Sequence, residues 1–525
     1  MSLVGRVGRK RPRARLAMLV VYGLLSLGAL TTLYPFATMV TTGFKGPTDQ
    51  DDGKLVPAFW TDESALAQKY LQEKYAGDLS VVKSYSIGAE ASQDELGQYK
   101  AMLMSLGPEQ WTAGFRNPPN NVTGRLQMRY QAWLRTRFDN DIEALNQAYS
   151  ELDGGFQTVV PPNEQYFRAD WHPEQDAKWK DWLEFKKTLP AEFRIPVRVE
   201  RIWQEWLRSK YAGQIDDVPD TVRQGADSFE EIPYPETRMM GLSAPWDDLL
   251  GEFLADGLPP AYKVDEGGLL TPEQLWSEVS HKPLPVRAFD LSVLHANEPT
   301  IKAEMSTRNY RYVLDYIAIN GRALWNTAIF CGLAVLVQLT VNPLAAYALS
   351  RFPMKATARV LLLLLATMAF PAEVAMIPQF LLLKHLGMLN TFAALVLPTA
   401  ANGYMIFLLK GFFDSLPKEV FESGQIDGAG EWRMMLRLAM PLSKPVLGYM
   451  GLLAFMGAYS AFMYAFVVAQ DRHIWTLMVF IYQLQQIAPK SVMMAAVTLA
   501  AIPTIFVFLA AQRVIMRGIV IPGER

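Results

Sequence analysis

Six apolar stretches divide this chain, and each is close to the roughly 20 residues that a helix needs to cross a lipid bilayer. Helices suit such stretches because a helix satisfies its backbone polar groups internally, where no water can do so. Residues 45–315 contain no such run and are rich in Trp, Pro and charge. The predicted fold class is therefore mainly α, a polytopic membrane protein with six transmembrane helices and a large soluble insertion between helices 1 and 2. The expected helices are Leu16–Val40, Ala323–Leu349, Val360–Leu383, Thr391–Leu409, Val446–Ala469 and Val492–Ala511.

Charge is divided unevenly between the insertion and the rest of the chain. Residues 45–315 carry 29 Lys and Arg against 44 Asp and Glu, a net charge of −15, whereas the remainder carries 21 against 8, a net charge of +13. We therefore predict a basic N-terminus with helix 1 (1–44), an acidic soluble domain (45–315), and a basic membrane domain with five helices (316–525). The single cysteine, Cys331, lies in a predicted helix, so core packing alone must hold the soluble domain together.

Basic clusters fix the expected orientation. The apolar run that follows the basic N-terminus is longer than a signal-peptide core and lacks a convincing cleavage site, so it is expected to remain as a helix. If the N-terminus is cytoplasmic, residues 45–315 are extracytoplasmic and six crossings return the C-terminus to the cytoplasm. Every basic cluster then falls on the cytoplasmic side, as the positive-inside rule requires. These clusters contain Arg6, Arg9, Lys10, Arg11, Arg13, Arg15, Arg351, Lys355, Arg359, Lys410, Arg513, Arg517 and Arg525.

A polar segment, Glu422–Leu442, lies between two of the predicted membrane helices. Pro417 suits the first turn of one helix, and Gly424 and Gly428 allow a turn after it. Asp427 can cap a second helix. The segment is therefore expected to be a helix–turn–helix that docks into a partner's groove through an apolar face. That face is expected to contain Met434, Met435, Leu438 and Ala439.

This segment resembles the cytoplasmic coupling loop, or "EAA" loop, of ATP-binding-cassette importer permeases, and more narrowly the maltose-type carbohydrate permease family. That loop reads Glu-Ala-Ala, then Asp-Gly-Ala, then Leu-Pro-Leu; Ser423 and Gly424 stand here in place of the two alanines. The matching residues are Glu422, Asp427, Gly428, Ala429, Pro441 and Leu442. The resemblance continues through Trp325-Asn326-Thr327, Leu344–Arg351, Pro371, Glu373, Pro378, Leu386–Thr391, Met494–Pro503 and Gln512-Arg513.

The resemblance implies a permease subunit of an ATP-binding-cassette importer that carries a sugar or oligosaccharide. It implies a bacterial inner (plasma) membrane location and four kinds of partner: a dimer of ATPase subunits, a second permease subunit in a heterodimer, an extracytoplasmic solute-binding protein, and the lipid bilayer. The coupling loop, at 411–445, would contact the ATPase. The contact residues implied are Glu422, Gly424, Asp427, Gly428, Ala429, Trp432 and Pro441.

Enzymatic chemistry is not expected in this chain. No glycine-rich loop ends in Gly-Lys-Ser or Gly-Lys-Thr, so ATP and Mg²⁺ are expected to bind the partner ATPase and no cofactor is expected here. The five histidines are scattered, which predicts no metal site, and no catalytic residue is assigned. Arginines beside a membrane span favour lipid contact over nucleic acid.

Polar residues within predicted spans are candidates for a substrate path, because polar groups inside a bilayer are costly without a function. Amides and aromatic rings suit a sugar, which offers hydroxyls and apolar ring faces. The alternative is packing, in which such groups satisfy backbone polar atoms at a kink, as Asn342 before Pro343 can. The candidates are Glu373, Asn402, Tyr404, Tyr459, Ser460 and Tyr464.

The soluble domain contains a weak internal repeat of the pattern aromatic-Leu-x-x-basic-aromatic. Its copies begin at Tyr70, Trp133 and Trp206, and the second and third are followed by a Phe and a pair of prolines. The repeat predicts short helices that close onto loops, although chance similarity in an aromatic-rich domain is the alternative.

Two other functional readings stay open from the residues alone. The chain can be a membrane-anchored glycan-binding or glycan-processing outer domain, or a sensor that uses a transporter scaffold. In the importer reading, the soluble domain docks the binding protein or caps the mouth of the translocation path.

Overall fold

The computed structural model describes residues 12–76, 91–116, 121–234, 244–259, 262, 271–272, 274–276, 283–319, 322–352, 355–368 and 371–516. Over these residues the protein is mainly helical, in agreement with the predicted fold class. The chain forms two compact units. Unit 1 contains Met1–Asn309 and Ile487–Val492, and unit 2 contains Tyr310–Gln486 and Met493–Arg525. The basic residues Arg6–Arg11 and Arg517–Arg525 lie outside the described residues.

Unit 1 consists of helices and one small sheet, and its helices other than α1 and α13 are short. Strands β1 and β2 are antiparallel, with Trp111 opposite Pro196 and Ala113 opposite Arg194. The α-helices are α1 (Pro12–Thr42), α2 (Glu63–Lys74), α4 (Gln93–Ser105), α5 (Arg125–Arg137), α6 (Ile142–Tyr149), α7 (Ala177–Lys187), α8 (Val199–Lys210), α9 (Asp220–Arg223), α10 (Ala244–Glu252), α12 (Val286–Ala296) and α13 (Glu298–Leu314). The short elements are η1 (Ala58–Trp60), β1 (Trp111–Ala113), η2 (Phe156–Thr158), η3 (Ala191–Phe193), β2 (Arg194–Pro196), η4 (Ile215–Asp217), η5 (Phe229–Glu231) and η6 (Phe253–Gly257).

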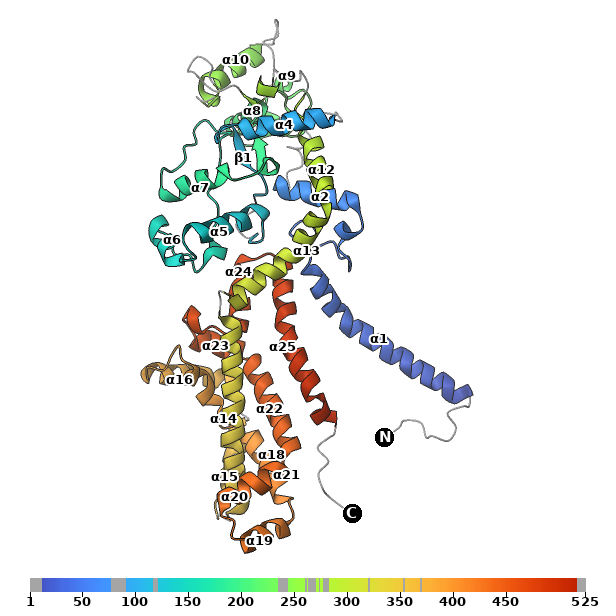
Figure 1. Cartoon of the computed structure of the whole chain (residues 1–525), viewed down its shortest axis with the longest axis vertical. Helices are drawn as coiled ribbons and strands as arrows, with labels where there is room; N and C mark the ends of the chain where they lie inside the picture. The colour runs from blue at the N-terminus through green and yellow to red at the C-terminus, as the bar shows by residue number, and fades with distance from the viewer. Residues whose placement is uncertain are drawn as a thin grey trace. The chain divides into compact units, whose positions relative to one another are not determined.

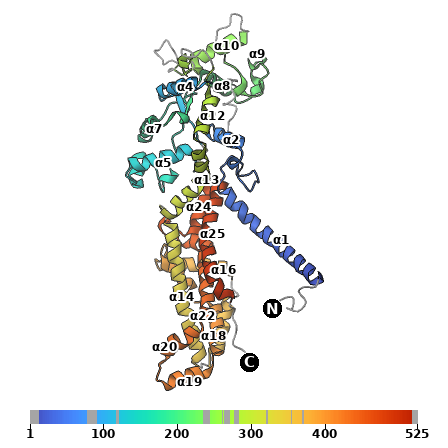
Figure 2. The same ribbon diagram turned by 45° about the vertical axis from the view of Figure 1, so that its right-hand side comes forward.

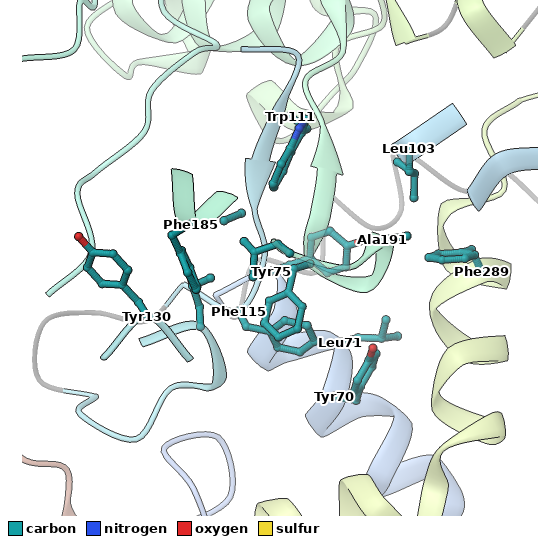
Figure 3. Packing of buried hydrophobic residues seen from close by; sticks show 14 of the residues in the cluster. Tyr70, Leu71, Tyr75, Leu103, Trp111, Phe115, Tyr130, Phe185, Ala191 and Phe289 are labelled. Atoms are coloured by element: carbon teal, nitrogen blue, oxygen red, sulfur yellow. The ribbon is translucent and has the colours of Figure 1, made fainter. Parts of the chain in front are cut away.

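The soluble domain holds itself together through a core that is dense in aromatic rings, as its lack of disulfides requires. Tyr70, Phe115 and Phe193 are buried and in ring contact, with centroids 5.0–5.3 Å apart. Tyr130 and Phe185 meet at 5.1 Å in the same cluster (Figure 3). A second core, within residues 197–262, gathers around Trp203. Burial of large rings from many short helices supplies the stabilisation that a regular sheet would otherwise give.

The internal repeat is visible in how α5 and α8 close onto the turns that follow them. The side-chain amide of Gln131 donates to the carbonyls of Gln157 and Val159 at 3.1 and 3.0 Å. The amide of Gln204 donates to the carbonyls of Glu230 and Ile232 at 3.0 and 3.1 Å. The two copies therefore share both a sequence pattern and a hydrogen-bond pattern, which supports the repeat for these two helices. Pro235 of the third copy lies outside the described residues.

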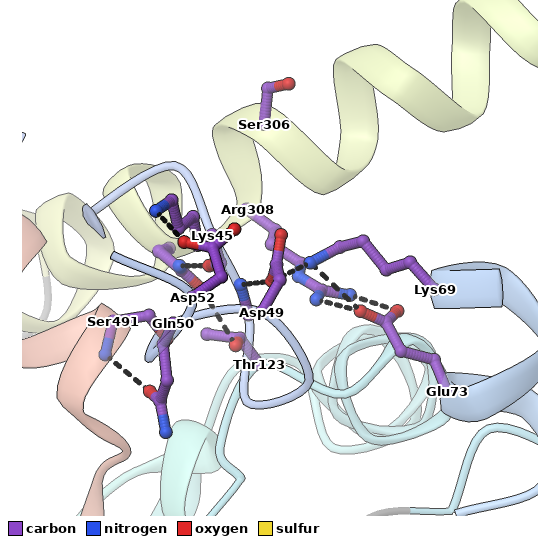
Figure 4. A network of polar contacts seen from close by, with 12 residues as sticks. Lys45, Asp49, Gln50, Asp52, Lys69, Glu73, Thr123, Ser306, Arg308 and Ser491 are labelled. Carbon is purple, nitrogen blue, oxygen red and sulfur yellow. Dashed lines mark hydrogen bonds and ion pairs between the residues drawn. The ribbon is translucent and has the colours of Figure 1, made fainter. Parts of the chain in front are cut away.

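A buried polar network joins the segment after α1 to α2 and α13 (Figure 4). Arg308 forms a two-pronged ion pair with Glu73, and the side chains are 2% and 4% exposed. Lys69 pairs with Asp49 at 2.5 Å, and Asn309 donates to backbone carbonyls at the end of α1. Buried charges are stable only when paired and hydrogen-bonded, so this network fixes the geometry of the segment. The same segment contacts residues 487–492 through Gln50, which accepts from the backbone N–H of Ser491 at 2.9 Å.

Unit 2 is a helical bundle around α14. Figures 1 and 2 both show α14 beside α22 and α18, which are its main neighbours. The α-helices are α14 (Ala323–Arg351), α15 (Thr357–Met368), α16 (Ala372–His385), α17 (Phe392–Val396), α18 (Gly403–Asp414), α19 (Lys418–Ile426), α20 (Glu431–Met434), α21 (Met440–Leu442), α22 (Lys444–Tyr459), α23 (Phe462–Val468), α24 (Leu477–Ile487) and α25 (Lys490–Met516). The short helical elements are η9 (Asp315–Ile319), η10 (Leu397–Thr399), η11 (Met435–Ala439) and η12 (Arg472–Ile474).

The predicted membrane helices differ in continuity. Among the described residues, Met18–Thr42, Ala323–Arg351 and Lys490–Gln512 are long and apolar enough to cross a membrane, and up to five crossings result if each bent pair counts as one. The expectation that Val360–Leu383, Thr391–Leu409 and Val446–Ala469 are continuous helices is wrong. Pro371 occupies the N-cap position of α16, and Ser460 is the C-cap of α22 before α23 begins. Six crossings remain a prediction.

Candidate functional site

The polar segment between α18 and α22 forms the predicted helix–turn–helix at one end of the unit 2 bundle (Figure 1). Helix α19 ends in a Schellman motif: the N–H of Gly428 donates to the carbonyl of Gln425 at 3.0 Å, and the N–H of Ala429 donates to that of Gly424 at 2.9 Å. Gly428 has φ +71°, a conformation that costs a residue with a Cβ atom free energy. The turn therefore depends on glycine at this position.

Two details of the predicted caps are wrong. Asp427 does not cap the second helix but is the C-cap of α19, and Gly430 stands at the N-cap of α20. Pro417 is the N-cap residue of α19 rather than part of its first turn. The physical reason is the Schellman motif, which places two further residues between the helices and moves the start of α20 beyond the reach of Asp427.

One face of this segment packs on the chain's own helices. Met434, Met435 and Ala439 are buried in a core with residues of α14, α18 and α22, so the apolar face expected for a partner is largely occupied. Gly424 is buried against Leu438, whose Cδ1 would lie 3.1 Å from an added Cβ atom. The substitution of glycine for the family's alanine therefore lets the second half of the segment approach α19 closely.

Contacts from the end of α14 hold the segment in place. The guanidinium of Arg351 lies over the ring of Phe421, 3.3 Å from its centroid. The hydroxyl of Tyr347 donates to the carboxylate of Glu431 at 2.9 Å. An Arg–aromatic stack and a hydrogen bond to a carboxylate both restrict orientation, so movement of α14 and movement of this segment are linked.

The opposite face is solvent-exposed and carries large apolar side chains. Ile426 is 86% exposed, Trp432 67% and Leu436 55%. Glu422 and Asp427 lie exposed beside them, as do Gly428 and Pro441, while Ala429 is half-buried. Three exposed apolar groups on one ordered segment are typical of a protein–protein contact surface. Sequence reasoning identified Trp432 but not Ile426 or Leu436, because periodicity alone does not say which face the chain itself covers.

The six candidate substrate-path residues differ in their surroundings, and four of them make hydrogen bonds within unit 2. The hydroxyls of Tyr459 and Tyr464 donate to the carbonyls of Ala500 and Ala394 at 2.5 and 2.7 Å, and Ser460 is exposed and donates to its own helix. Asn402 caps α18 by accepting from the N–H of Met405. Glu373 and Tyr404 are exposed. The packing alternative therefore has direct support for the two tyrosines and for Asn402.

The bend between η10 and α18 is held by Asn342, which is fully buried in α14. Its side-chain oxygen accepts from the backbone N–H of Asn402 at 2.8 Å, and its amide donates to the carbonyl of Ala400 at 3.3 Å. These bonds satisfy backbone groups that a 51° bend removes from a helix. Asn342 therefore satisfies backbone groups at a bend, as its position before Pro343 suggested, but the bend lies between η10 and α18 rather than in its own helix.

Comparison with known proteins places this unit among transport proteins. A family model described as binding-protein-dependent transport system inner membrane component matches residues 342–521. The chain is 30% identical over 198 residues to Probable ABC transporter permease protein YurM of Bacillus subtilis, which covers 37% of this chain and 66% of that protein. It is 28% identical over 199 residues to Diacetylchitobiose uptake system permease protein NgcG of Streptomyces coelicolor, with coverage of 37% and 66%. It is 30% identical over 227 residues to Trehalose/maltose transport system permease protein MalG of Thermococcus litoralis, with coverage of 42% and 82%. The chain therefore spans just under two thirds of the length of the first two of these relatives.

Proposed function

Because the chain belongs to the family of binding-protein-dependent transport system inner membrane components, we propose that it is a permease subunit of an ATP-binding-cassette importer. The ATPase resides in a separate subunit, present in two copies, that binds ATP and Mg²⁺. The family match supports this role over the anchored glycan module and the sensor, the two alternatives that the residues left open. A second permease subunit, in a heterodimer, and an extracytoplasmic solute-binding protein complete the proposed assembly.

The exposed face of the coupling loop carries the proposal. Ile426, Trp432 and Leu436 project from a segment that is fixed to α14 through Arg351 and Glu431. Such a surface suits a groove on the ATPase, with Glu422 as a charged contact at its edge. When ATP closes the ATPase pair, a pull on this segment passes directly to α14, the helix at the centre of the bundle.

The proposed solute is a carbohydrate. Two of the relatives are named for the uptake of diacetylchitobiose and of trehalose or maltose. Of the candidate path residues, Glu373, Tyr404 and Ser460 have exposed side chains. In the proposed arrangement, the protein crosses the bacterial inner membrane six times, with both termini cytoplasmic and residues 45–315 extracytoplasmic.

A purification from the native host tests the assembly. The tagged chain is extracted in mild detergent, and its partners are identified by mass spectrometry. We expect an ATPase subunit, a second permease and a binding protein. The variants Glu422→Lys and Trp432→Ala should lose the ATPase while the chain stays in the membrane, because each alters the exposed face and not the buried one.

Glu184→Lys is the matched control, since Glu184 is an exposed glutamate on α7 of unit 1. It should recover the ATPase at the wild-type level. Recovery of no ATPase with the wild-type chain, under conditions that keep another importer intact, would refute the proposal. Equal recovery with Glu422→Lys would remove this residue from the contact.

A further inference from the structure

Unit 1 contains a cavity of about 540 Å³ beside the small sheet. Its walls come from β1, β2, the start of α8 and the segment 163–168, with Lys74 and Ala76 at the end of α2. A second cavity, of about 450 Å³, shares Phe167, Arg168 and Glu205 with the first. Because they share these walls, the two cavities are adjacent parts of one groove across α8, and we call it the α8 groove.

Nearly every charged side chain that lines the first cavity is neutralised within unit 1. Lys74 pairs with Asp290 at 2.5 Å, and Glu164 pairs with Lys186 at 2.6 Å. Three further lining residues also form ion pairs within unit 1: Arg168 with Asp170 at 2.7 Å, Arg201 with Glu230 at 3.5 Å, and Glu205 with Arg208 at 2.9 Å. These groups shape the groove but leave it little net charge.

Arg116 is the exception among the described residues that line the cavity. Its guanidinium donates to the carbonyl of Pro162 and to the side-chain oxygen of Asn163, and both acceptors are neutral. It lies over the ring of Trp182, 5.6 Å from the centroid, and burial lowers the pKa of Arg116 from its ordinary value. The buried carboxylate of Glu164 acts on Arg116 electrostatically, but it pairs with Lys186, so two cations share one carboxylate. A cation that is compensated only in part is costly to bury. An anionic ligand would relieve that cost, and the planar guanidinium fork matches a carboxylate well.

The other end of the groove is aromatic. Phe167 and Trp206 are half-buried, and both line the second cavity. The Trp206 ring is held by Trp203, with centroids 5.5 Å apart, and by Gly257, where an added Cβ atom would come within 2.6 Å of the ring. A ring fixed in this way loses little freedom when a flat apolar surface stacks on it, and the face of a sugar ring is such a surface.

We propose that the α8 groove binds an acidic oligosaccharide, with a carboxylate on Arg116 and sugar rings against Phe167 and Trp206. This inference rests on the proposed function, from which it takes only that the solute is a carbohydrate. It makes unit 1 a solute-binding part of the permease subunit and names the class of solute by its charge. The partly compensated charge of Arg116 lies in a domain whose net charge is −15, so any preference for an anion comes from this position and not from the charge of the whole domain.

Binding to the full chain in lipid nanodiscs tests the inference by calorimetry. The probes are trigalacturonate and the same trimer with all carboxylates methyl-esterified, which is neutral. Trigalacturonate should bind about tenfold tighter or more, because hydrogen bonds to a charged group are stronger than those to a neutral one. Arg116→Gln should abolish that difference and leave the affinity of the ester unchanged. Arg287→Gln, on the exposed side of α12, removes the same charge outside the groove and should behave as wild type.

Trp206→Ala provides a second variant that leaves Arg116 in place, and it should weaken both trimers by the same factor. Equal binding of the two trimers, no binding of either, or an unchanged preference in Arg116→Gln would each overturn the inference. Co-purification of the ATPase with Arg116→Gln is read in parallel. If the ATPase is recovered but the wild-type chain does not bind trigalacturonate more tightly than the methyl-esterified trimer, only this inference fails. If no ATPase is recovered with any form of the chain, the importer proposal fails, whatever the trimers do.

Discussion

At the scale of single residues, the buried pair of Glu73 and Arg308 makes unit 1 sensitive to the loss of either partner. Glu73→Gln removes the negative partner and leaves a guanidinium that is 2% exposed. We expect this variant to lose about 3–5 kcal/mol of unfolding free energy, because an unpaired buried charge has no water to solvate it. Urea unfolding followed by tryptophan fluorescence measures the loss. Glu184→Gln, which breaks an exposed pair with Lys187, should leave the urea midpoint unchanged.

The same pair predicts how stability depends on pH. Burial alone would raise the pKa of Glu73, but the charge and hydrogen bonds of Arg308 outweigh it, so the pKa lies below the ordinary value of 4.5. A carboxylate with a lowered pKa in the folded state contributes its full stabilisation above its ordinary pKa, and loses it as the pH falls through the folded value. We expect the urea midpoint to hold down to about pH 4.5 and to fall below it. In Glu73→Gln, the part of this decrease in the urea midpoint that comes from Glu73 should be missing. If the midpoint depended on pH identically in both proteins, Glu73 would not be the group responsible.

At the scale of elements, the repeated helix–turn unit predicts a local effect. Gln204→Leu removes two hydrogen bonds and leaves the carbonyls of Glu230 and Ile232 buried without that donor. The cost should be about 1–3 kcal/mol and should appear in the core around Trp203. Hydrogen exchange read by mass spectrometry should show faster exchange in 197–234, with residues 121–160 unchanged.

Gln68 offers a control for this prediction. It stands at the same place in the first copy, two residues before Tyr70, but it is exposed on α2. Gln68→Leu should therefore leave the exchange pattern as it is in the wild type. If both variants gave the same pattern, the glutamine would not act through the turn.

The turn of the coupling loop predicts a different kind of effect. Gly428 has φ +71° and open space around it, so Gly428→Ala is disfavoured by backbone conformation alone, by about 1–2 kcal/mol. We expect this variant to retain less ATPase on co-purification, because the Schellman motif sets the direction of α20. Gly430→Ala is the matched control: Gly430 has φ −69° and equally open space, so recovery should be unchanged. Equal recovery in both variants would show that the turn geometry does not matter for docking.

Residues within the coupling loop were enough to predict its two helices and the turn between them, but not the role of Asp427 or the face that is buried. The two helices and the intervening turn follow from Pro417, Gly424 and Gly428, which act within a few residues of their own position. The cap assigned to Asp427 was wrong because an Asp between two helices can serve either one, and the Gly428 conformation decides. The buried side of Met434 and Met435 depends on α14, which is distant in sequence, so periodicity cannot assign it. Unit 1 is the extreme case, since its helices are short and its core joins residues from 59 to 305.

At the scale of the whole molecule, the division into an acidic and a basic part and the six crossings remain predictions. Unit 1 and unit 2 meet in the chain at Asn309 and Tyr310, six residues before the boundary expected from composition. Among the described residues, three helices are long and apolar enough to span a bilayer, and the number rises to as many as five if each bent pair is one span. A break within a span is tolerated only where neighbouring groups satisfy the freed backbone, which Asn342 does for the pair Phe392–Asp414.

Cysteine labelling decides whether that bent pair crosses the membrane. In a Cys331→Ser background, which has no native thiol, Glu174→Cys and Ser423→Cys place one exposed thiol in unit 1 and one in the coupling loop. Three predicted spans separate the two positions, so we expect a membrane-impermeant maleimide to label Glu174→Cys in intact cells and Ser423→Cys only after permeabilisation. The background protein without an added cysteine should stay unlabelled. If the bent pair turned back instead of crossing, only two spans would separate the positions, and both would be labelled from outside. That result would place the coupling loop away from any cytoplasmic ATPase, because an odd number of crossings is what brings it to the opposite side from unit 1.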